Sequence, residues 1–586
     1  MGEVTLDELI EEVKEKESIT TESQETTEML KATTKEVIKA SESGKIKILT
    51  DYDADGITSA YILERNIKAI NPKCEVEVKC NDRRKSYGLT SFLEEEIDVN
   101  CRYIICDMGT NELDKARKHF GENVIIIDHH LTDDDKIRNQ FIDNKKNNAC
   151  LCNPHMINKN DKNNAQYCTA GLTYRIAQIS SKDCSKYSID LKTENSIKAM
   201  ACIGTATDVV NVLDTNSYNR NILKNGIITI NNADESNFDF VLGNILARND
   251  ISEETTAHEL AFKVGAFINS ASRMSEIINE NGSQLLYNVL NGDKGAFKTY
   301  KQIEKFEKQN KERKSFISGL TTEEYYKEFI NEQRYGNNKN DNIAVYLLPD
   351  DVPSAFAGLI AGKLAETCDK AIICLTYKSD KGYYIGSGRN SNSNETSLID
   401  FLKDSLKDTG IEITYGGHEN AIGISSVKDF VDFQKIIDNN KDKILRKELE
   451  KQPILKIDLA DINNPETLEK VMQLEPLGMG LEMPPLLVEG KELRRNMNFI
   501  KGREDWKRIQ VKAKSENITI TDWSYSPNSY PQEKTNISFL AKVSVNDFNG
   551  KHLELTSMFN RDFLSERMYT LTNNENKKKP TQIENR

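Results

Sequence analysis

The chain has 586 residues, of which 38% are hydrophobic and 29% are charged, and its formal net charge is −13. This length exceeds what one core supports, and the composition is that of a soluble globular protein with several domains. No apolar run approaches the roughly 20 residues that a membrane span needs, and the acidic N-terminus lacks the apolar stretch of a secretory signal. Eleven cysteines without regular spacing indicate reduced thiols in a cytoplasmic protein. The net charge lowers the expectation of nucleic-acid binding without excluding it, because local patches count for more than the total.

The first half of the sequence predicts an α/β domain. Residues 1–44 are polar and helix-prone, and we expect them to form a loosely attached extension. From there to residue 215, strand-like runs alternate with helical stretches, which predicts a doubly wound domain with a mainly parallel sheet. The expected strands are residues 45–49, 75–80, 102–106 and 123–127, with a helix over 59–70.

The second half predicts a connecting region and two smaller domains. Residues 216–335 have a helical pattern, and 293–320 predict a long exposed helix that joins two lobes. A second α/β pattern covers residues 336–450. Short β-rich runs over 451–565 predict a small OB-like β-barrel, and residues 566–586 have the composition of a disordered tail.

Carboxylates and imidazoles follow the ends of three expected strands. These side chains are Asp51, Asp53, Asp55, Asp107, Asp128, His129 and His130. Because ligands bind at the carboxyl ends of strands in an open parallel sheet, we expect these side chains to meet at one edge. Asp208, which follows another apolar run and a glycine, is a fourth candidate position.

Crowded carboxylates raise one another's pKa unless a cation lies between them. Oxygen ligands with one or two imidazoles suit Mg²⁺ or Mn²⁺. Two such ions about 4 Å apart would activate a water molecule and stabilise a displacement at phosphorus. One Asp-rich turn is also typical of a helix cap or a solvated loop, and Cys150, Cys152 and His155 resemble a zinc half-site without a second pair. The occurrence of the acids after different strands favours the divalent-cation hypothesis.

Four segments resemble the successive motifs of DHH phosphoesterases: residues 51–59, 106–112, 128–130 and 204–210. More narrowly, the chain resembles the RecJ-type exonucleases, which are specific for single strands and act 5′→3′, over roughly residues 45–562. Further matches lie at 83–89, 167–178, 260–274, 353–366, 386–390, 416–425 and 475–490. The segments between 353 and 425 resemble the DHHA1 domain, and 475–490 resembles the entry to an OB-like domain.

The resemblance implies two ions, Mn²⁺ or Mg²⁺, and a set of metal ligands. The implied ligands are Asp53, Asp55, Asp107, His129 and Asp208. Asp107 would bridge the ions, His130 would lie beside them, and Asp51 and Asp128 would support the site from outside the ligand shell. The family often has a further ligand four residues before Asp53, a position that Leu49 occupies here, so the first ion would be held more weakly.

The resemblance also implies that the DHHA1 lobe closes over the metals and binds the substrate phosphate. The implied phosphate-binding residues are Arg84 or its neighbour Arg83, Asn269, Arg273, Ser387, Arg389 and His418. The glycine-rich segments around Arg389 and His418 are alternatively simple turns, and Arg273 is alternatively part of an interdomain ion pair. Ala266 and Phe267 replace a Pro-Arg pair of the family.

In the C-terminal domain, basic and aromatic residues fit a platform for single strands or a barrel core. They are Lys501, Arg503, Trp506, Lys507, Arg508, Trp523 and Tyr525.

The function that this resemblance implies is hydrolysis of single-stranded DNA from its 5′ end to mononucleotides, in recombination, repair or replication. We expect a cytoplasmic monomer with no membrane association. A phosphodiesterase for short oligonucleotides or cyclic dinucleotides is one alternative, and a non-catalytic binding scaffold is another. The sequence leaves open whether a helicase or a single-strand-binding protein assists, and whether RNA is also a substrate.

Overall fold

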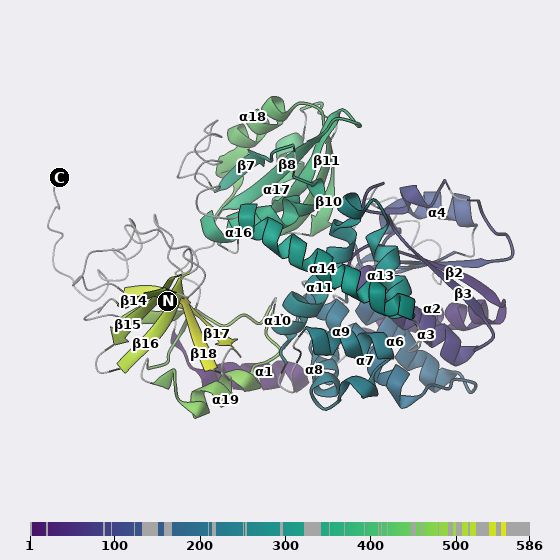
Figure 1. Cartoon of the computed structure of the whole chain (residues 1–586), viewed down its shortest axis with the longest axis horizontal. Coiled ribbons are helices and arrows are strands. Elements are labelled where there is room, and N and C mark those ends of the chain that lie inside the picture. Colours follow the sequence, from purple (N-terminus) through teal and green to yellow (C-terminus); the bar gives the residue numbers. More distant parts are fainter. Residues whose placement is uncertain are drawn as a thin grey trace.

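The computed structural model describes residues 3–557, with gaps of four residues or more at 132–150, 158–166, 214–217, 293–296, 321–341, 447–452, 490–495, 500–506, 523–537 and 547–551, and shorter gaps elsewhere. At one end of the molecule lies a five-stranded parallel sheet in the order β3-β2-β4-β5-β6 (Figure 1). Its strands are β2 (Lys45–Thr50), β3 (Glu75–Cys80), β4 (Arg102–Cys106), β5 (Ile125–Ile127) and β6 (Leu151–Cys152). The prediction of a mainly parallel α/β domain is confirmed.

Helices cover both faces of this sheet, as its apolar strands require. Ile46, Ile48 and Ile104 point into a core shared with helices on one face. Leu49 and Ile105 point to the other face, where they pack with α4. The helices that enclose the sheet are α2 (Gln24–Glu42), α3 (Ala54–Ile70), α4 (Leu113–Phe120), α6 (Thr169–Asp183) and α7 (Leu191–Thr207). In domains of this kind, ligands bind at the carboxyl edge of the sheet.

The N-terminal segment is not loosely attached, and this expectation was wrong. Helix α2 buries Leu30 and Val37 completely against the domain, because its apolar residues recur on one face. Strand β1 (Glu3–Val4) pairs with β12 (Ile454–Leu455), which belongs to the C-terminal sheet. Helix α1 (Leu6–Ser18) packs against α19 (Pro465–Gln473) in the same region. Residues 3–42 therefore link the first domain to the last.

A helical region connects the parallel sheet to the second lobe, as predicted. Its elements are α8 (Tyr218–Asn231), α9 (Phe240–Arg248), α10 (Ala257–Glu259), a π-helical segment (Leu260–Gly265), α11 (Ala266–Arg273), α12 (Ser275–Ile278), α13 (Gly282–Leu290) and α14 (Phe297–Leu320). Helix α14 is not wholly exposed, since Phe306 and Arg313 on one side of it are buried. It packs against α11 and α13 and also reaches α16 of the second lobe.

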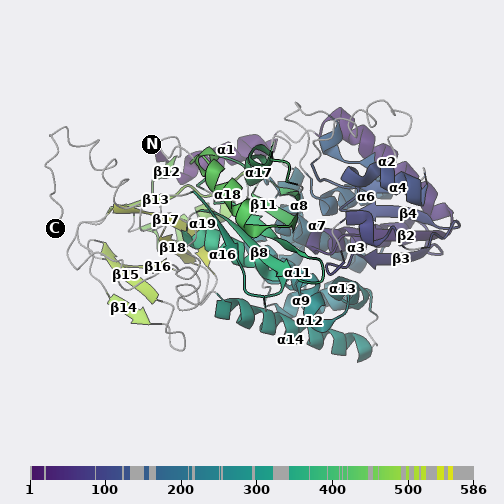
Figure 2. The same cartoon turned by 90° about the horizontal axis from the view of Figure 1, so that it is seen from above.

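The second lobe is a smaller α/β unit with the sheet order β10-β11-β9-β8-β7. Only β7 and β8 run parallel; the other pairs are antiparallel. The elements are β7 (Ile343–Leu347), α16 (Ala357–Cys368), β8 (Ala371–Lys378), β9 (Tyr383–Arg389), α17 (Leu398–Leu406), β10 (Thr414–His418), β11 (Ala421–Val427) and α18 (Phe430–Asn440). Figures 1 and 2 place this lobe between the two ends of the molecule.

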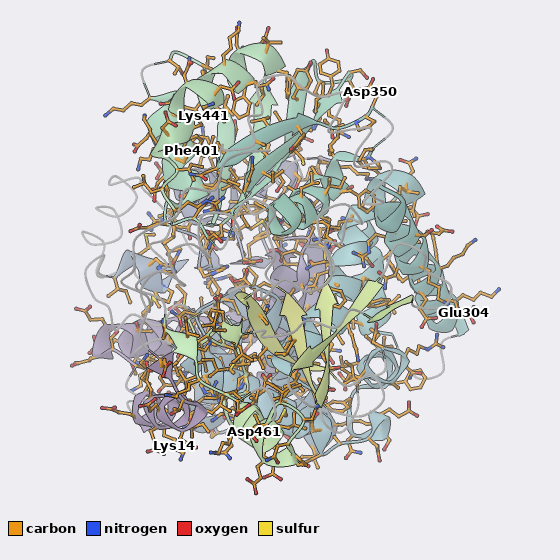
Figure 3. The ribbon with its side chains drawn as sticks, turned by 90° about the vertical axis from the view of Figure 1, so that its left-hand side faces the viewer. Lys14, Glu304, Asp350, Phe401, Lys441 and Asp461 are labelled. Atoms are coloured by element: carbon orange, nitrogen blue, oxygen red, sulfur yellow. The ribbon has the colours of Figure 1, made fainter. Side chains whose placement is uncertain are left out.

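The C-terminal domain is an eight-stranded mixed sheet in the order β1-β12-β13-β17-β18-β16-β15-β14. The remaining strands are β13 (Leu486–Glu489), β14 (Asn496–Phe499), β15 (Lys507–Ala513), β16 (Glu516–Asp522), β17 (Ser538–Asn546) and β18 (His552–Ser557). The β-rich character was predicted, whereas closure into an OB-like barrel stays a prediction. Figure 3 views this sheet from its own side, with Lys14 of α1 and Asp461 at one end and Phe401 and Lys441 of the second lobe at the other.

A buried arginine fixes the C-terminal domain to the first domain. Arg220 of α8 has no exposed side-chain surface. It donates hydrogen bonds to the carbonyl oxygens of Leu474, Glu475 and Pro476 and forms an ion pair with Glu17. Within the described residues, no helix is long and apolar enough to cross a bilayer.

Candidate metal centre

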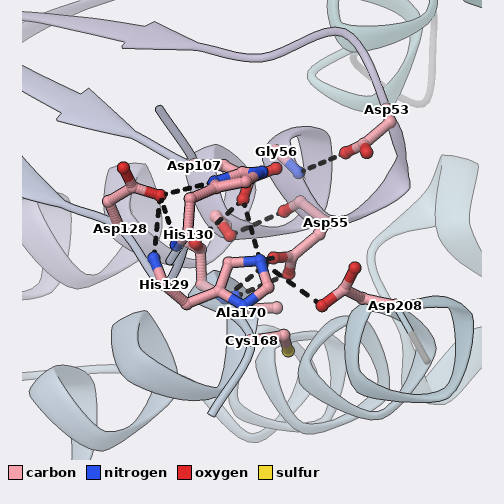
Figure 4. Close-up of polar contacts among 12 residues, drawn as sticks. Asp53, Asp55, Gly56, Asp107, Asp128, His129, His130, Cys168, Ala170 and Asp208 are labelled. Atoms are coloured by element: carbon pink, nitrogen blue, oxygen red, sulfur yellow. Dashed lines mark hydrogen bonds and ion pairs between the residues drawn. The ribbon is translucent and has the colours of Figure 1, made fainter. Parts of the chain in front are cut away.

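Four segments bring acids and imidazoles to the carboxyl edge of the parallel sheet (Figure 4). Asp51, Asp53 and Asp55 lie where β2 turns into α3, and Asp107 follows β4 directly. Asp128, His129 and His130 follow β5. Asp208 caps the C-terminal end of α7, so it reaches the site from a helix rather than from a strand. The sequence predicts the meeting of these groups but not the helical origin of Asp208.

Asp55 is held by the first turn of a neighbouring helix. Its carboxylate accepts hydrogen bonds from the backbone N–H groups of Thr169 (2.7 Å) and Ala170 (2.8 Å) at the start of α6. The N-terminal end of a helix favours negative charge, so α6 fixes the position of Asp55 and partly offsets the cost of its ionisation. The close approach requires a glycine in α7, because a Cβ on Gly204 would lie 2.5 Å from the Cβ of Ala170 and 2.4 Å from Oγ1 of Thr58.

Asp107 has a backbone conformation that is rare outside glycine, with φ at 62°. Such a conformation costs on the order of 1 kcal/mol, and its retention is typical of sites where a side chain must be aimed. The backbone N–H of Asp107 still continues the sheet by donating to the carbonyl of Ile127 (2.9 Å). Its carboxylate accepts a hydrogen bond from Oγ1 of Thr169 (3.0 Å). The strained backbone thus turns the carboxylate toward the other acids.

His129 lies at the centre of the cluster. Its Nε2 atom is 3.5 Å from Oδ1 of Asp107, 3.7 Å from Oδ2 of Asp55 and 3.4 Å from Oδ2 of Asp208. These separations exceed good hydrogen bonds and match ligands arranged around a shared centre. The side chain is 5% exposed. A buried imidazole facing three carboxylates is a suitable arrangement for binding a cation.

The ligand atoms form three groups in which every atom lies within 4.8 Å of the others. These groups are Asp51, Asp53 and Asp107; Asp55, His129 and Asp208; and Asp107, His129 and His130. Asp107 and His129 each belong to two of the groups, and the bridging role of Asp107 stays a prediction. The donor set of several carboxylates with one or two imidazoles fits Mg²⁺ or Mn²⁺.

The structure places Asp51 closer to the site than the sequence analysis expected. Leu49 is buried in the sheet, where it packs with Ile105, and does not reach the acidic cluster. Asp51, two residues further along, lies within ligand distance of Asp53 and Asp107. A carboxylate therefore lies in the group of Asp53 and Asp107 even though position 49 is apolar.

Burial and mutual repulsion disfavour ionisation of these acids in the absence of a cation. Burial, together with the neighbouring charge of Asp53, raises the pKa of Asp51 to about 7 and that of Asp55 to about 6. Burial and the charge of Asp55 raise the pKa of Asp107 and of Asp208 well above the usual range. A divalent cation removes this penalty by neutralising the charge, which is the physical reason to expect one here.

Basic and polar groups face the acidic cluster from the connecting helices and the second lobe. Asn269 of α11 accepts a hydrogen bond from the backbone N–H of Ala54 (2.9 Å), beside Asp53 and Asp55. Arg273 lies one helical turn further along. Burial and the charges of other arginines (Arg83, Arg313 and Arg389) lower the pKa of Arg273 to about 9. Among the described residues, no carboxylate forms an ion pair with Arg273, which disfavours the interdomain ion pair.

The second lobe contributes Arg389 and Ser387 from β9. The Nη1 atom of Arg389 donates to Oγ of Ser387 and to the carbonyl of Gly388, each at 2.8 Å. Helix α16 packs directly on this guanidinium, since a Cβ on Gly358 would lie 2.9 Å from its Nη2 atom. His418 is the last residue of β10, which pairs with β11, the neighbour of β9 in the sheet. The side chain of His418 lies outside the described residues.

The two arginines of the loop after β3 have different partners. Arg84 forms an ion pair with Asp82 (2.6 Å) and a hydrogen bond with Asn279 (3.1 Å). The guanidinium of Arg83 lies over the ring of Tyr52, 5.0 Å from its centroid, and Tyr52 stands between Asp51 and Asp53. Arg83 thus lies beside the turn that carries Asp51 and Asp53, whereas Arg84 is bound by Asp82. This difference favours Arg83 over Arg84 as the phosphate-binding arginine of the loop.

Thr169 is a site residue that the sequence analysis did not single out. It binds Asp55 through its N–H and Asp107 through its hydroxyl. Its only sequence signal is its place at a helix start, after Cys168.

Phe267 is buried in the core, so no basic side chain replaces the family's arginine there. The proposed C-terminal aromatic platform lies outside the described side chains, and Cys152 packs in the core without a zinc-like group among the described residues.

Comparisons with known proteins agree with this geometry. Residues 45–205 match the DHH family, N-terminal domain. The single-stranded-DNA-specific exonuclease RecJ of Bacillus subtilis is 23% identical over 535 residues, and the match covers 87% of this chain and 60% of that protein. The chain thus spans about 60% of the length of that relative.

Two crystal structures of RecJ from Thermus thermophilus share the fold. The complex with Mn²⁺ matches with a TM-score of 0.64 at 18% identity, covering 91% of this chain and 71% of that one. The complex with Mg²⁺ matches with a TM-score of 0.60 at 17% identity, covering 91% and 70% of the two chains.

Proposed function

We propose that the chain, which matches the DHH family over residues 45–205 and is similar to RecJ over most of its length, is a metal-dependent exonuclease that removes mononucleotides from the 5′ end of single-stranded DNA. The observation that carries this proposal is the convergence of acids and imidazoles from four segments into three ligand groups that share residues. The names of the relatives support the substrate and its single-strandedness.

The residues divide into two metal sites that share Asp107. We assign Asp51 and Asp53, with Asp107, to the first ion, and Asp55, His129 and Asp208, with Asp107, to the second. Mg²⁺ or Mn²⁺ bound there would supply an acidified water as the nucleophile and charge neutralisation at the phosphate.

The remaining groups position the metal ligands and the substrate phosphate. Asp128 holds the loop that carries His129 and His130, through hydrogen bonds to both backbone N–H groups. Arg273 lies near both Asp53 and Arg389, whose charges act on it. Arg273 and Arg389 would bind phosphate oxygens, where a guanidinium offers bidentate geometry. Asn269 fixes the start of α3 and with it the Asp53–Asp55 turn. These groups would hold the scissile phosphate beside the acids and would stabilise the negative charge that develops on it during hydrolysis.

A nuclease assay tests the proposal. Strands blocked at the 5′ or the 3′ end, of about 20 nucleotides, are incubated with purified protein and Mn²⁺ or Mg²⁺, beside Asp107→Ala. We expect mononucleotides from the 3′-blocked strand, none from the 5′-blocked strand, and no product with Asp107→Ala. Cleavage of dinucleotides but not of long strands would instead identify a phosphodiesterase for short substrates. Binding without any cleavage would identify a scaffold.

A further inference from the structure

An exposed aromatic pair stands on the helix that leads to the metal centre. The rings of His258 and Phe262 are stacked, with centroids 6.1 Å apart and planes inclined by 14°. Phe262 is 68% exposed, although it belongs to a well-packed helical segment. Exposing so much of a phenylalanine is unfavourable, which makes it a candidate contact surface.

This pair is continuous with residues already placed beside the acids. Along the helix from α10 to α11, His258, Phe262, Ala266, Asn269 and Arg273 are at least partly accessible, as are Glu259, Ala261 and Lys263 beside them. The spacing of three and four residues puts the first five on one face, while Leu260, Val264 and Ile268 are buried on the other. Seven residues separate Phe262 from Asn269, which corresponds to about 10 Å along a helix. The aromatic pair therefore lies a short distance along the same face as the metal centre.

One lysine of the C-terminal sheet lies near the pair, and Lys263, next to Phe262, forms an ion pair with Glu259 (3.0 Å). Partial shielding of His258, and after it the charge of Lys542 of β17 in the C-terminal sheet, lower the pKa of the imidazole. The imidazole thus lies within reach of the charge of this lysine. Figure 1 shows α10 at the side of the first domain that faces this sheet. The segment is also π-helical between Leu260 and Gly265, a local widening that is frequent at functional sites.

We propose that His258 and Phe262 form a stacking platform for a nucleobase of the bound single strand, between the metal centre and the C-terminal sheet. This inference rests on the proposed function. A base presents a flat apolar face to an aromatic ring, and nearby lysines neutralise the strand's phosphates. Between the platform and Asn269 stands Ala266, which has a small side chain and is partly accessible. A strand whose 5′ end lies at the metals would thus place one of its following bases on Phe262.

Abasic scanning of the strand tests this platform. Binding of 5′-phosphorylated, 3′-fluorescent 12-mers is measured by anisotropy with Ca²⁺ in place of Mn²⁺, each strand lacking one base at a successive position. For the unaltered protein we expect one position, or two adjacent ones, at which loss of the base weakens binding by about 5- to 150-fold. Phe262→Ala should bind the complete strand more weakly by a similar factor. In this variant, loss of the base at that position should cause no further loss of affinity. Phe262→Tyr retains the position dependence.

Two controls make the result decisive. Ile228 on α8 is 56% exposed and belongs to no proposed site, so Ile228→Ala should bind and scan like the unaltered protein. His258→Ala, a second variant in the pair, should reduce the effect at the same position. An unchanged affinity and an unchanged scan in Phe262→Ala would overturn the platform. Failure of the unaltered protein to bind or cut any single strand would instead overturn the proposed function itself.

Discussion

The Nδ1 atom of His130 lies 2.8 Å from Oδ1 of Asp128, and both side chains are shielded from solvent. Burial opposes the charged form of each, but the two groups stabilise each other. The pKa of His130 rises to about 9, and that of Asp128 falls well below its usual range. Asp128 also accepts hydrogen bonds from the backbone N–H groups of Thr110, His129 and His130. This carboxylate therefore organises the loop that presents the imidazoles.

Replacement of Asp128 by asparagine should destabilise the protein strongly. The change keeps the shape but leaves the partly buried imidazolium without its counter-charge, a loss of about 3–5 kcal/mol for a buried pair. Urea unfolding at pH 7 with EDTA measures the free energy of unfolding. Asp98→Asn, which breaks the surface pair with Lys45, is the matched control and should cost less than about 1 kcal/mol. Equal costs for the two variants would show that Asp128 has no special structural role.

Removal of the shared carboxylate should abolish activity and disturb both ions. Asp107→Asn retains the side-chain size but removes the charge that both proposed sites use, so we expect activity to fall by on the order of 10²–10³-fold or more. Titration of the metal-free variant with Mn²⁺, followed by electron paramagnetic resonance, should show weaker binding at both sites. Asp404→Asn, on the exposed face of α17, should match the unaltered protein. Full activity of Asp107→Asn is incompatible with the assignment.

Asp51→Asn separates a direct ligand from an outer-sphere role. If Asp51 binds the first ion, the variant should lose one of two Mn²⁺ equivalents in an equilibrium titration. A supporting residue outside the ligand shell would instead lower the affinity by about 10- to 100-fold with two equivalents still bound. We expect the loss of one equivalent, because Asp51 lies within ligand distance of Asp53 and Asp107. Retention of both equivalents would return Asp51 to the supporting role.

The acidic cluster predicts a pH dependence that a cation reverses. Asp51 and Asp55 titrate near 7 and 6 in the folded, cation-free protein and near 3.9 when unfolded. The folded state therefore binds more protons between about pH 4 and 7, and its stability falls as the pH rises through this window. The melting temperature with EDTA should be lower at pH 7.5 than at pH 5, and Mn²⁺ should raise it more at pH 7.5 because cations and protons compete.

The control for this prediction is Asp51→Asn, which removes one of the titrating groups. Its melting temperature in EDTA should change less between pH 5 and pH 7.5 than that of the unaltered protein. Identical pH profiles for the two proteins would contradict the origin that we assign to the effect.

The two arginines of the β3 loop should differ in their effect on substrate. Arg83 has no carboxylate partner among the described residues, whereas Arg84 is engaged by Asp82. Arg83→Ala should therefore raise KM for single strands by roughly tenfold, the size of one charge-assisted hydrogen bond. Arg84→Ala should lower the thermal stability with a smaller change in KM. Steady-state kinetics and melting curves of the two variants check both statements, and the reverse ranking of KM would exchange the roles.

The sequence by itself determined the parallel sheet and the gathering of acids at its edge. Both follow from local information, since apolar strands alternate with helices and Asp51, Asp107 and Asp128 each come directly after a strand. Parallel pairing then leaves the acids no other place than one edge. The DHH motifs were recognisable for the same reason, because each is a short segment that turns from a strand into the site.

Only the tertiary structure decided how the parts join and which neighbours face the cluster. Asn269 reaches Ala54 across 215 residues of sequence, and Arg220 binds carbonyl groups more than 250 residues away. Three further features depend likewise on how whole helices and strands pack together. They are the packing of α2 on the first domain, the ion pair of Arg84 with Asp82, and the position of Asp51 beside Asp53 and Asp107. Such contacts are set by the packing of distant surfaces against one another, for which a single sequence carries no periodic signal.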